Sequence, residues 1–85
     1  MNRIFKALND PIRRRIIELL KEKDMNVGEI FQNFQITMPT LSHHLDILKQ
    51  ADILTSEKKG QFVYYSLNMT IIEDILQWIL TIKNK

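Results

Sequence analysis

The sequence predicts a mainly α-helical fold with one small β-hairpin, in a single domain spanning residues 1–85. Three observations lead to this fold class. Apolar residues recur at helical spacing over most of the chain, and cap-forming side chains precede those stretches. After residue 52 the pattern changes to two β-prone runs around one glycine. A domain this small leaves much of its surface uncovered, so a partner subunit would stabilise it.

The composition is that of an ordinary globular protein, with 45% hydrophobic and 26% charged residues. The formal charge of +2 is too small to indicate a partner by itself. Because cysteine is absent, disulfides, thiolate metal sites and a cysteine nucleophile are excluded, and the reducing cytoplasm is the expected location. No secretion signal opens the sequence, and the most apolar stretch, IIEDILQWIL, is too short to insert into a membrane.

Two helices are expected at the start of the chain. Residues 2–8 predict a short helix that exposes three apolar side chains, Ile4, Phe5 and Leu8. Asp10 can cap the next helix, and Pro11 suits its first position because the N–H that proline lacks would be unpaired there. This second helix extends to about Lys23, and its spacing predicts one buried face formed by Ile12, Ile16, Leu19 and Leu20.

Two further helices follow in close succession. Asn26 and Glu29 have the spacing of a capping box, which predicts a short third helix through Phe31. After a tight connection, Thr37 can cap a fourth helix that tolerates Pro39 in its first turn and extends to about Ala51.

The last third of the chain predicts a hairpin and a helix. Two β-prone runs flank Lys58, Lys59 and Gly60, and glycine supplies the positive φ that a tight turn needs. Thr70 and Glu73 predict a capping box for a C-terminal helix. Four helices, a hairpin and a final helix are the layout of a winged helix-turn-helix domain, in which the fourth helix enters the DNA major groove and the hairpin is the wing.

The two histidines are adjacent, yet the helical period separates them. His44 shares a face with Leu41, Leu45 and Leu48, so we expect it to be buried with one hydrogen-bonded nitrogen. Met38, Thr40, Ser42 and His43 project to other sides, where short polar side chains can contact bases and phosphates. Neighbouring helical residues point about 100° apart, and no H-x-x-x-H spacing exists, so a metal site is not expected.

Basic residues elsewhere have more than one interpretation. Lys58 and Lys59 favour phosphate or minor-groove contact, although lysines also protect the edges of sheets. Arg13, Arg14 and Arg15 predict a solvated face with local pairing, for example to Asp10 or Glu18, and which of them approaches DNA is left open. No G-x-S-x-G is present, and two glycines cannot form a phosphate-cradling loop, so neither catalysis nor a cofactor is expected.

The C-terminal helix is apolar on nearly every side except at Glu73, Asp74 and Gln77. Such a helix is expected to be buried on two sides. The alternative is a monomer with a few exposed apolar residues. We predict instead a two-fold dimer interface with the first helix, formed by Ile4, Phe5, Leu8, Ile72, Ile75, Leu76, Trp78, Ile79 and Ile82.

Three segments, residues 5–20, 41–51 and 59–67, resemble the ArsR/SmtB family of bacterial winged-helix repressors. The resemblance is greatest to its metal-independent branch, which contains the autorepressor of the sporulation-delaying operon. It implies a homodimer, joined by the terminal helices, that binds a palindromic operator and blocks transcription. It also implies base contacts from Met38 to His43 and backbone contacts around Lys58 to Gly60.

Where the metal sensors of this family carry a cysteine pair, this chain has Val27–Phe31, and its last helix has no histidine. These differences weigh against metal or arsenite sensing. The residues and the resemblance together give one predicted DNA-binding set: Thr37, Met38, Pro39, Thr40, Ser42, His43, Lys58, Lys59 and Gly60.

The expected function is an autoregulatory, homodimeric repressor that binds operator DNA. Because sensor ligands are lacking, the expected control is either the protein's own abundance or a regulatory protein that relieves repression. Two alternatives are a sensor with a metal or ligand site between subunits, built from His43, His44 or acidic residues, and a winged-helix module that binds proteins instead of DNA.

Overall fold

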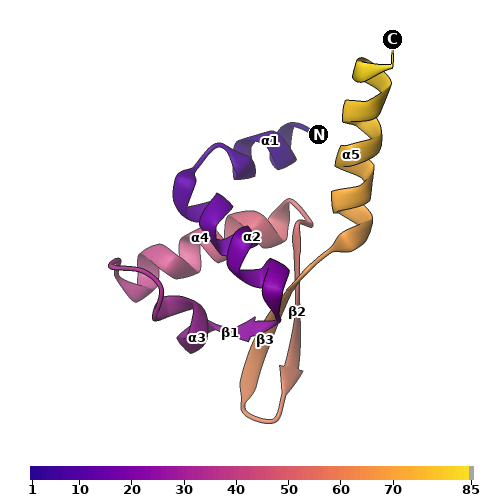
Figure 1. Cartoon of the computed structure of the whole chain (residues 1–85). Helices are drawn as coiled ribbons and strands as arrows, with labels where there is room; N and C mark the ends of the chain where they lie inside the picture. Colours follow the sequence, from indigo (N-terminus) through magenta and orange to yellow (C-terminus); the bar gives the residue numbers. More distant parts are fainter. Residues whose placement is uncertain (85) are drawn as a thin grey trace.

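Helices form most of the protein, and a three-stranded antiparallel sheet completes it, over the residues 1–84 that this computed structural model describes (Figure 1). The prediction of a mainly helical fold with a hairpin is confirmed. In chain order the elements are α1 (Asn2–Leu8), α2 (Pro11–Glu22), β1 (Met25–Asn26), α3 (Val27–Phe31), α4 (Met38–Gln50), β2 (Leu54–Lys59), β3 (Phe62–Leu67) and α5 (Met69–Lys83).

Side-chain caps begin three of the helices, as the sequence predicts. The Asp10 carboxylate accepts hydrogen bonds from two amides of the first turn of α2. The Asn26 side chain accepts from the Glu29 amide at 2.9 Å, and the Glu29 carboxylate accepts from the Asn26 amide at 3.0 Å. The Thr37 hydroxyl accepts from the Thr40 amide at 3.3 Å. These bonds satisfy amides that have no partner within their helix.

The capping box predicted at Thr70 and Glu73 is wrong. Helix α5 begins one residue before Thr70, and its N-cap, Asn68, makes no side-chain capping bond. The Asn68 amide instead donates to the Ile53 carbonyl at 2.8 Å, and the Asn68 carbonyl accepts the first helical bond from Ile72 at 3.2 Å. The end of the hairpin, rather than a side chain, therefore sets where α5 starts.

The sheet has the order β1-β3-β2. The predicted hairpin is confirmed, with Leu54 opposite Leu67 and Lys59 opposite Phe62, and Gly60 takes the turn with a φ of 64°. Strand β1, which pairs Met25 with Tyr65, was not expected from the sequence. Two residues are too short to show an alternating pattern, so this strand is defined only by its partner.

The core lies where α2, α3 and α4 meet the sheet. The chain leaves α4 sharply, because Asp52 adopts a φ of 60° and the Ile53 amide donates back to the Leu48 carbonyl at 3.0 Å. The fully buried large side chains are Ile16, Ile30, Leu41, Leu45, Leu48, Ile53 and Leu54.

The hairpin and α5 extend from the core in opposite directions (Figure 1). The Cα trace accordingly measures 47 × 25 × 20 Å along its principal axes. Helix α5 buries none of its residues. None of the helices within residues 1–84 is long and apolar enough to cross a bilayer.

Candidate nucleic-acid interface

Helix α4 has one buried face and one exposed face. The buried face consists of Leu41, His44, Leu45 and Leu48, as predicted. His44 is only 8% exposed, whereas His43 lies at the surface. Their ring centroids are 6.1 Å apart and the ring planes differ by 53°. The adjacent histidines therefore have separate surroundings.

The start of α4 is exposed throughout its predicted DNA-binding positions. These residues are Thr37, Met38, Pro39, Thr40, Ser42 and His43. The hydroxyl oxygens of Thr37 and Thr40 are 2.8 Å apart, so one hydroxyl donates to the other. Because Thr37 also caps the helix, these two side chains are held against the first turn, while Ser42 and His43 face solvent.

The hairpin carries the remaining predicted contacts. Lys58 and Lys59 are exposed on β2. Gly60 lies at the tip, and no residue other than its two chain neighbours comes within 4 Å of where its Cβ would be. The Lys59 ammonium lies 5.7 Å from the centre of the Tyr64 ring, a cation–π geometry that holds it against the hairpin.

Arg13 corrects the prediction that the three arginines form a solvated face. It is only 9% exposed. Its Nε donates to the Ala7 carbonyl at 2.7 Å, its Nη2 donates to the Lys6 carbonyl at 3.1 Å, and its Nη1 lies 3.1 Å from the Nδ1 of His44. Arg13 therefore joins the C-terminal end of α1 to the buried face of α4, and these three groups explain why an arginine is buried here.

The other two arginines are exposed, as predicted. Arg14 donates from Nη1 to the Leu8 carbonyl at 2.7 Å. The sequence suggested that Glu18 pairs with one of these arginines. Its carboxylate lies instead 3.4 Å from the Lys21 ammonium.

The Arg13–His44 contact has an electrostatic consequence. Burial lowers the pKa of His44; the Asp10 charge opposes this, and the charges of Arg13 and His43 lower the pKa further. The neutral imidazole can then accept a hydrogen bond at Nδ1 from the Arg13 Nη1 group. Burial raises the pKa of Asp10, but bonds from the Arg13 and Ile12 amides, with the His44 and Arg13 charges, outweigh it and hold the pKa below its usual value.

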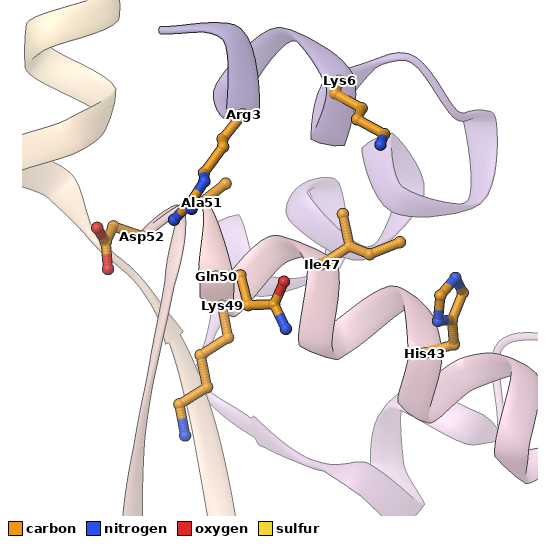
Figure 2. Close-up of a pocket in the computed structure, with 8 residues that line it drawn as sticks. All are labelled: Arg3, Lys6, His43, Ile47, Lys49, Gln50, Ala51 and Asp52. Atoms are coloured by element: carbon orange, nitrogen blue, oxygen red, sulfur yellow. The ribbon is translucent and has the colours of Figure 1, made fainter.

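An open groove of about 670 Å³ lies between α1 and α4, and His43 is one of the residues that line it (Figure 2). We call it the α1–α4 groove; its lining is Arg3, Lys6, His43, Ile47, Lys49, Gln50, Ala51 and Asp52. Arg3 and Lys6 were not expected at a site from the sequence. Their i, i+3 spacing, which places them on one side of a helix, was the available signal.

The predicted dimer residues divide into two groups. Ile4 and Leu8 are half-buried against the core, which corrects the expectation that α1 exposes them. Phe5 is exposed, and its ring centroid lies 5.3 Å from that of Trp78 on α5. On α5, Ile72 and Ile75 are half-buried and the remaining predicted residues, Leu76, Trp78, Ile79 and Ile82, are exposed.

Comparison with known proteins identifies the family. The family model of the arsR family of bacterial regulatory proteins matches residues 10–56. The chain is 52% identical to the transcriptional repressor SdpR of Bacillus subtilis (strain 168) over 85 residues, which are 100% of this chain and 94% of that protein.

Two solved structures share the fold. An ArsR-like transcriptional regulator from Rhodococcus sp. RHA1 has a TM-score of 0.90 at 19% identity and covers 98% of this chain and 76% of its own. A homodimeric winged helix-turn-helix DNA-binding domain from Mycobacterium bovis has a TM-score of 0.79 at 22% identity, covering 98% and 77%. The chain therefore belongs to the arsR family of bacterial regulatory proteins, and it is a transcription regulator with a winged helix-turn-helix fold.

Proposed function

We propose that this protein is a sequence-specific DNA-binding transcriptional repressor that acts as a homodimer on a palindromic operator. The observation that carries the proposal is the division of α4 into two faces. One face is packed into the core, and the start of the other exposes short polar side chains. A helix fixed in this way can enter the major groove while keeping its contact residues in place.

The role of each group follows from its position. Ser42 and His43 contact base edges or nearby phosphates, with Met38, Pro39 and Thr40 alongside them. Thr37 caps the helix and lies at the phosphate-facing end. Lys58, Lys59 and Gly60 bring the hairpin to the DNA backbone. The relative SdpR, named a transcriptional repressor, supports repression as the outcome of binding.

The dimer is formed by α5 and α1. The apolar residues that α5 leaves exposed support this assignment, as does the homodimeric state of the Mycobacterium bovis domain of the same fold. Two α4 helices then enter successive major grooves about 34 Å apart. We place the repressor in the cytoplasm on its own promoter, with no catalytic role, and with a regulatory protein that relieves repression.

A mobility-shift titration on the protein's own promoter region, repeated at several salt concentrations, tests the function. We expect saturable binding that weakens steeply with salt, because bound lysines and arginines displace counterions from DNA. In the variant Ser42→Ala/His43→Ala, affinity for the operator should fall at least about tenfold, since each good base contact contributes about 1–3 kcal/mol of discrimination.

The matched control is Thr81→Ala/Asn84→Ala, which removes two exposed polar side chains from the far end of α5. It should bind as the unmodified protein does. Absence of any specific shift by the unmodified protein would refute the function, whereas normal binding by a folded Ser42→Ala/His43→Ala variant would refute only the assignment of these contacts.

A further inference from the structure

The α1–α4 groove is a basic surface in which two helices contribute side chains to one space. Three cationic residues line it, Arg3 and Lys6 from α1 and Lys49 from α4, against the single carboxylate of Asp52. Figure 2 shows the Arg3 and Lys6 side chains extending from α1 toward α4, and the His43 ring extending from α4 toward α1. Lys49 extends from α4 away from α1.

The cations of this groove are not neutralised by the protein. Within residues 1–84, the ion pair between Lys21 and Glu18 on α2 is the only one shorter than 4.0 Å. Arg3, Lys6 and Lys49 are also exposed. Positive charges gathered in a concave surface without carboxylate partners produce a potential that attracts anions.

The position of the groove indicates which anion it binds. His43 belongs to the predicted DNA-contacting set and also lines the groove, so the two surfaces are continuous. The basic side of α1 is distinct from its aromatic side, where Phe5 packs near Trp78 of α5. Helix α1 can therefore contact a ligand beside α4 while its other side faces α5.

We propose that the α1–α4 groove binds backbone phosphates of the operator DNA, with Arg3 and Lys6 as the contacting residues. The DNA interface then extends from the start of α4 across to α1, beyond the helix-turn-helix and the wing. This inference rests on the proposed DNA-binding function. Phosphate contacts of this kind fix the position of the protein on the duplex and do not distinguish between sequences.

The test uses the variant Arg3→Ala/Lys6→Ala of the full chain in fluorescence-anisotropy titrations with the operator and with an unrelated duplex of equal length. Affinity should fall at least about tenfold on both duplexes. The negative slope of log K against log salt should become less steep by about 0.9 for each phosphate that the variant no longer neutralises. The matched control is Lys21→Ala/Lys23→Ala, which removes the same charge from the end of α2 and should change neither the slope nor the affinity by a comparable amount.

The outcomes separate this inference from the function. If the unmodified protein binds its operator and the Arg3→Ala/Lys6→Ala variant keeps both affinity and salt slope, the groove assignment is overturned while the function stands. Equal losses of affinity in Arg3→Ala/Lys6→Ala and Lys21→Ala/Lys23→Ala would show a general charge effect, and they would also overturn the groove assignment. Absence of DNA binding by the unmodified protein would overturn both.

A second measurement distinguishes DNA phosphate from a free anion. The His43 ring resonances, followed by NMR, should shift on addition of the duplex and not on addition of inorganic phosphate at the same concentration. Saturation by inorganic phosphate, with duplex affinity unchanged in the Arg3→Ala/Lys6→Ala variant, would show a free-anion site instead.

Discussion

Helices α4 and α5 are similar in length, 13 and 15 residues, yet they bury their side chains in opposite ways. Four residues of α4 are buried within the chain, whereas none of the more apolar α5 is. Apolar content alone thus does not decide burial; the elements available to pack against a helix do. An apolar helix that lacks such neighbours presents a surface for a second molecule.

The two helices also differ in how their polar residues are distributed. Apart from the buried His44, the polar residues of α4 lie away from its core face, and DNA contact is proposed for those at its start. On α5, Glu73, Asp74, Gln77 and Thr81 lie on one side of the helix, and the other sides are apolar as far as Lys83 in the last turn. In the proposed homodimer, one helix therefore serves DNA binding and the other serves association.

The largest effect on DNA binding is expected from charges placed on the apolar side of α5. In Ile79→Glu/Ile82→Glu, two residues that are 49% and 55% exposed would carry charge into the proposed interface, where desolvation is costly. We expect monomers by sedimentation velocity and an operator affinity lower by about 100-fold or more, because the second half-site loses its tethered partner.

Its control, Gln77→Glu/Thr81→Glu, adds the same charge on the polar side of α5 and should remain dimeric. A dimeric Ile79→Glu/Ile82→Glu variant with unchanged operator affinity would locate the interface elsewhere.

A matched truncation compares the two helices directly. Leu48 on α4 is 0% exposed and Leu76 on α5 is 52% exposed. In urea unfolding, Leu48→Ala should lower the free energy of unfolding by about 2–5 kcal/mol, because it leaves a cavity in the core. In dilute protein, Leu76→Ala should lower the free energy of unfolding by no more than about 0.5 kcal/mol. The loss should grow as the protein concentration rises and dimers form. Equal losses of stability in dilute protein would contradict the contrast between these helices.

Arg13 provides an intermediate effect. The Arg13→Met variant keeps much of the side-chain length but removes the donors to the Ala7 and Lys6 carbonyls and to His44. The free energy of unfolding should fall by about 1–3 kcal/mol, the cost of leaving a buried polar group unpaired. Arg15→Met, at an exposed position of the same helix, should change it by no more than about 0.5 kcal/mol. Similar values for the two variants would show that the Arg13 bonds contribute little.

The smallest effect is a pH dependence from His44. Its pKa in the folded protein is below the ordinary 6.5, so the unfolded chain binds the proton more readily. Stability from this group is therefore complete above pH 6.5 and decreases as the pH falls toward the folded pKa. Asp10, whose pKa is below 3.8, contributes only at still lower pH.

Urea unfolding between pH 5 and pH 8 measures the His44 effect, with approximate limits chosen to bracket an ordinary histidine pKa. His44→Gln should flatten the dependence, because the amide oxygen can accept from Arg13 and does not titrate. His43→Gln should leave the dependence in place. If His43→Gln flattened the pH dependence and His44→Gln did not, the dependence would belong to His43.

Much of the fold was predictable because its signals are local. Asp10, the Asn26–Glu29 pair and Thr37 each lie next to the helix they begin, and Gly60 lies in the turn it permits. The errors arose where distant segments decide the outcome. Strand β1 exists through its pairing with β3, and α5 begins where the Asn68 amide meets Ile53.

The exposure of the candidate site residues was predictable to a similar degree. The helical period alone separates His44 from His43, so one was correctly expected in the core and the other at the surface. The period does place Arg13 beside Leu20, at the edge of the buried face of α2. It could not show that an arginine is buried there, because the groups that accept its hydrogen bonds come from α1 and α4. It also could not show that Arg3 and His43 line one groove, since that depends on how α1 packs on α4.

The open tip of the hairpin makes this chain suited to site-specific labelling. The sequence contains no cysteine, and Gln61 is exposed next to Gly60, around which nothing crowds the turn. A single Gln61→Cys substitution would give the protein one reactive thiol, at the end of the molecule opposite α5. A fluorophore attached there would report the approach of the hairpin to DNA without disturbing the core or the helix proposed for association.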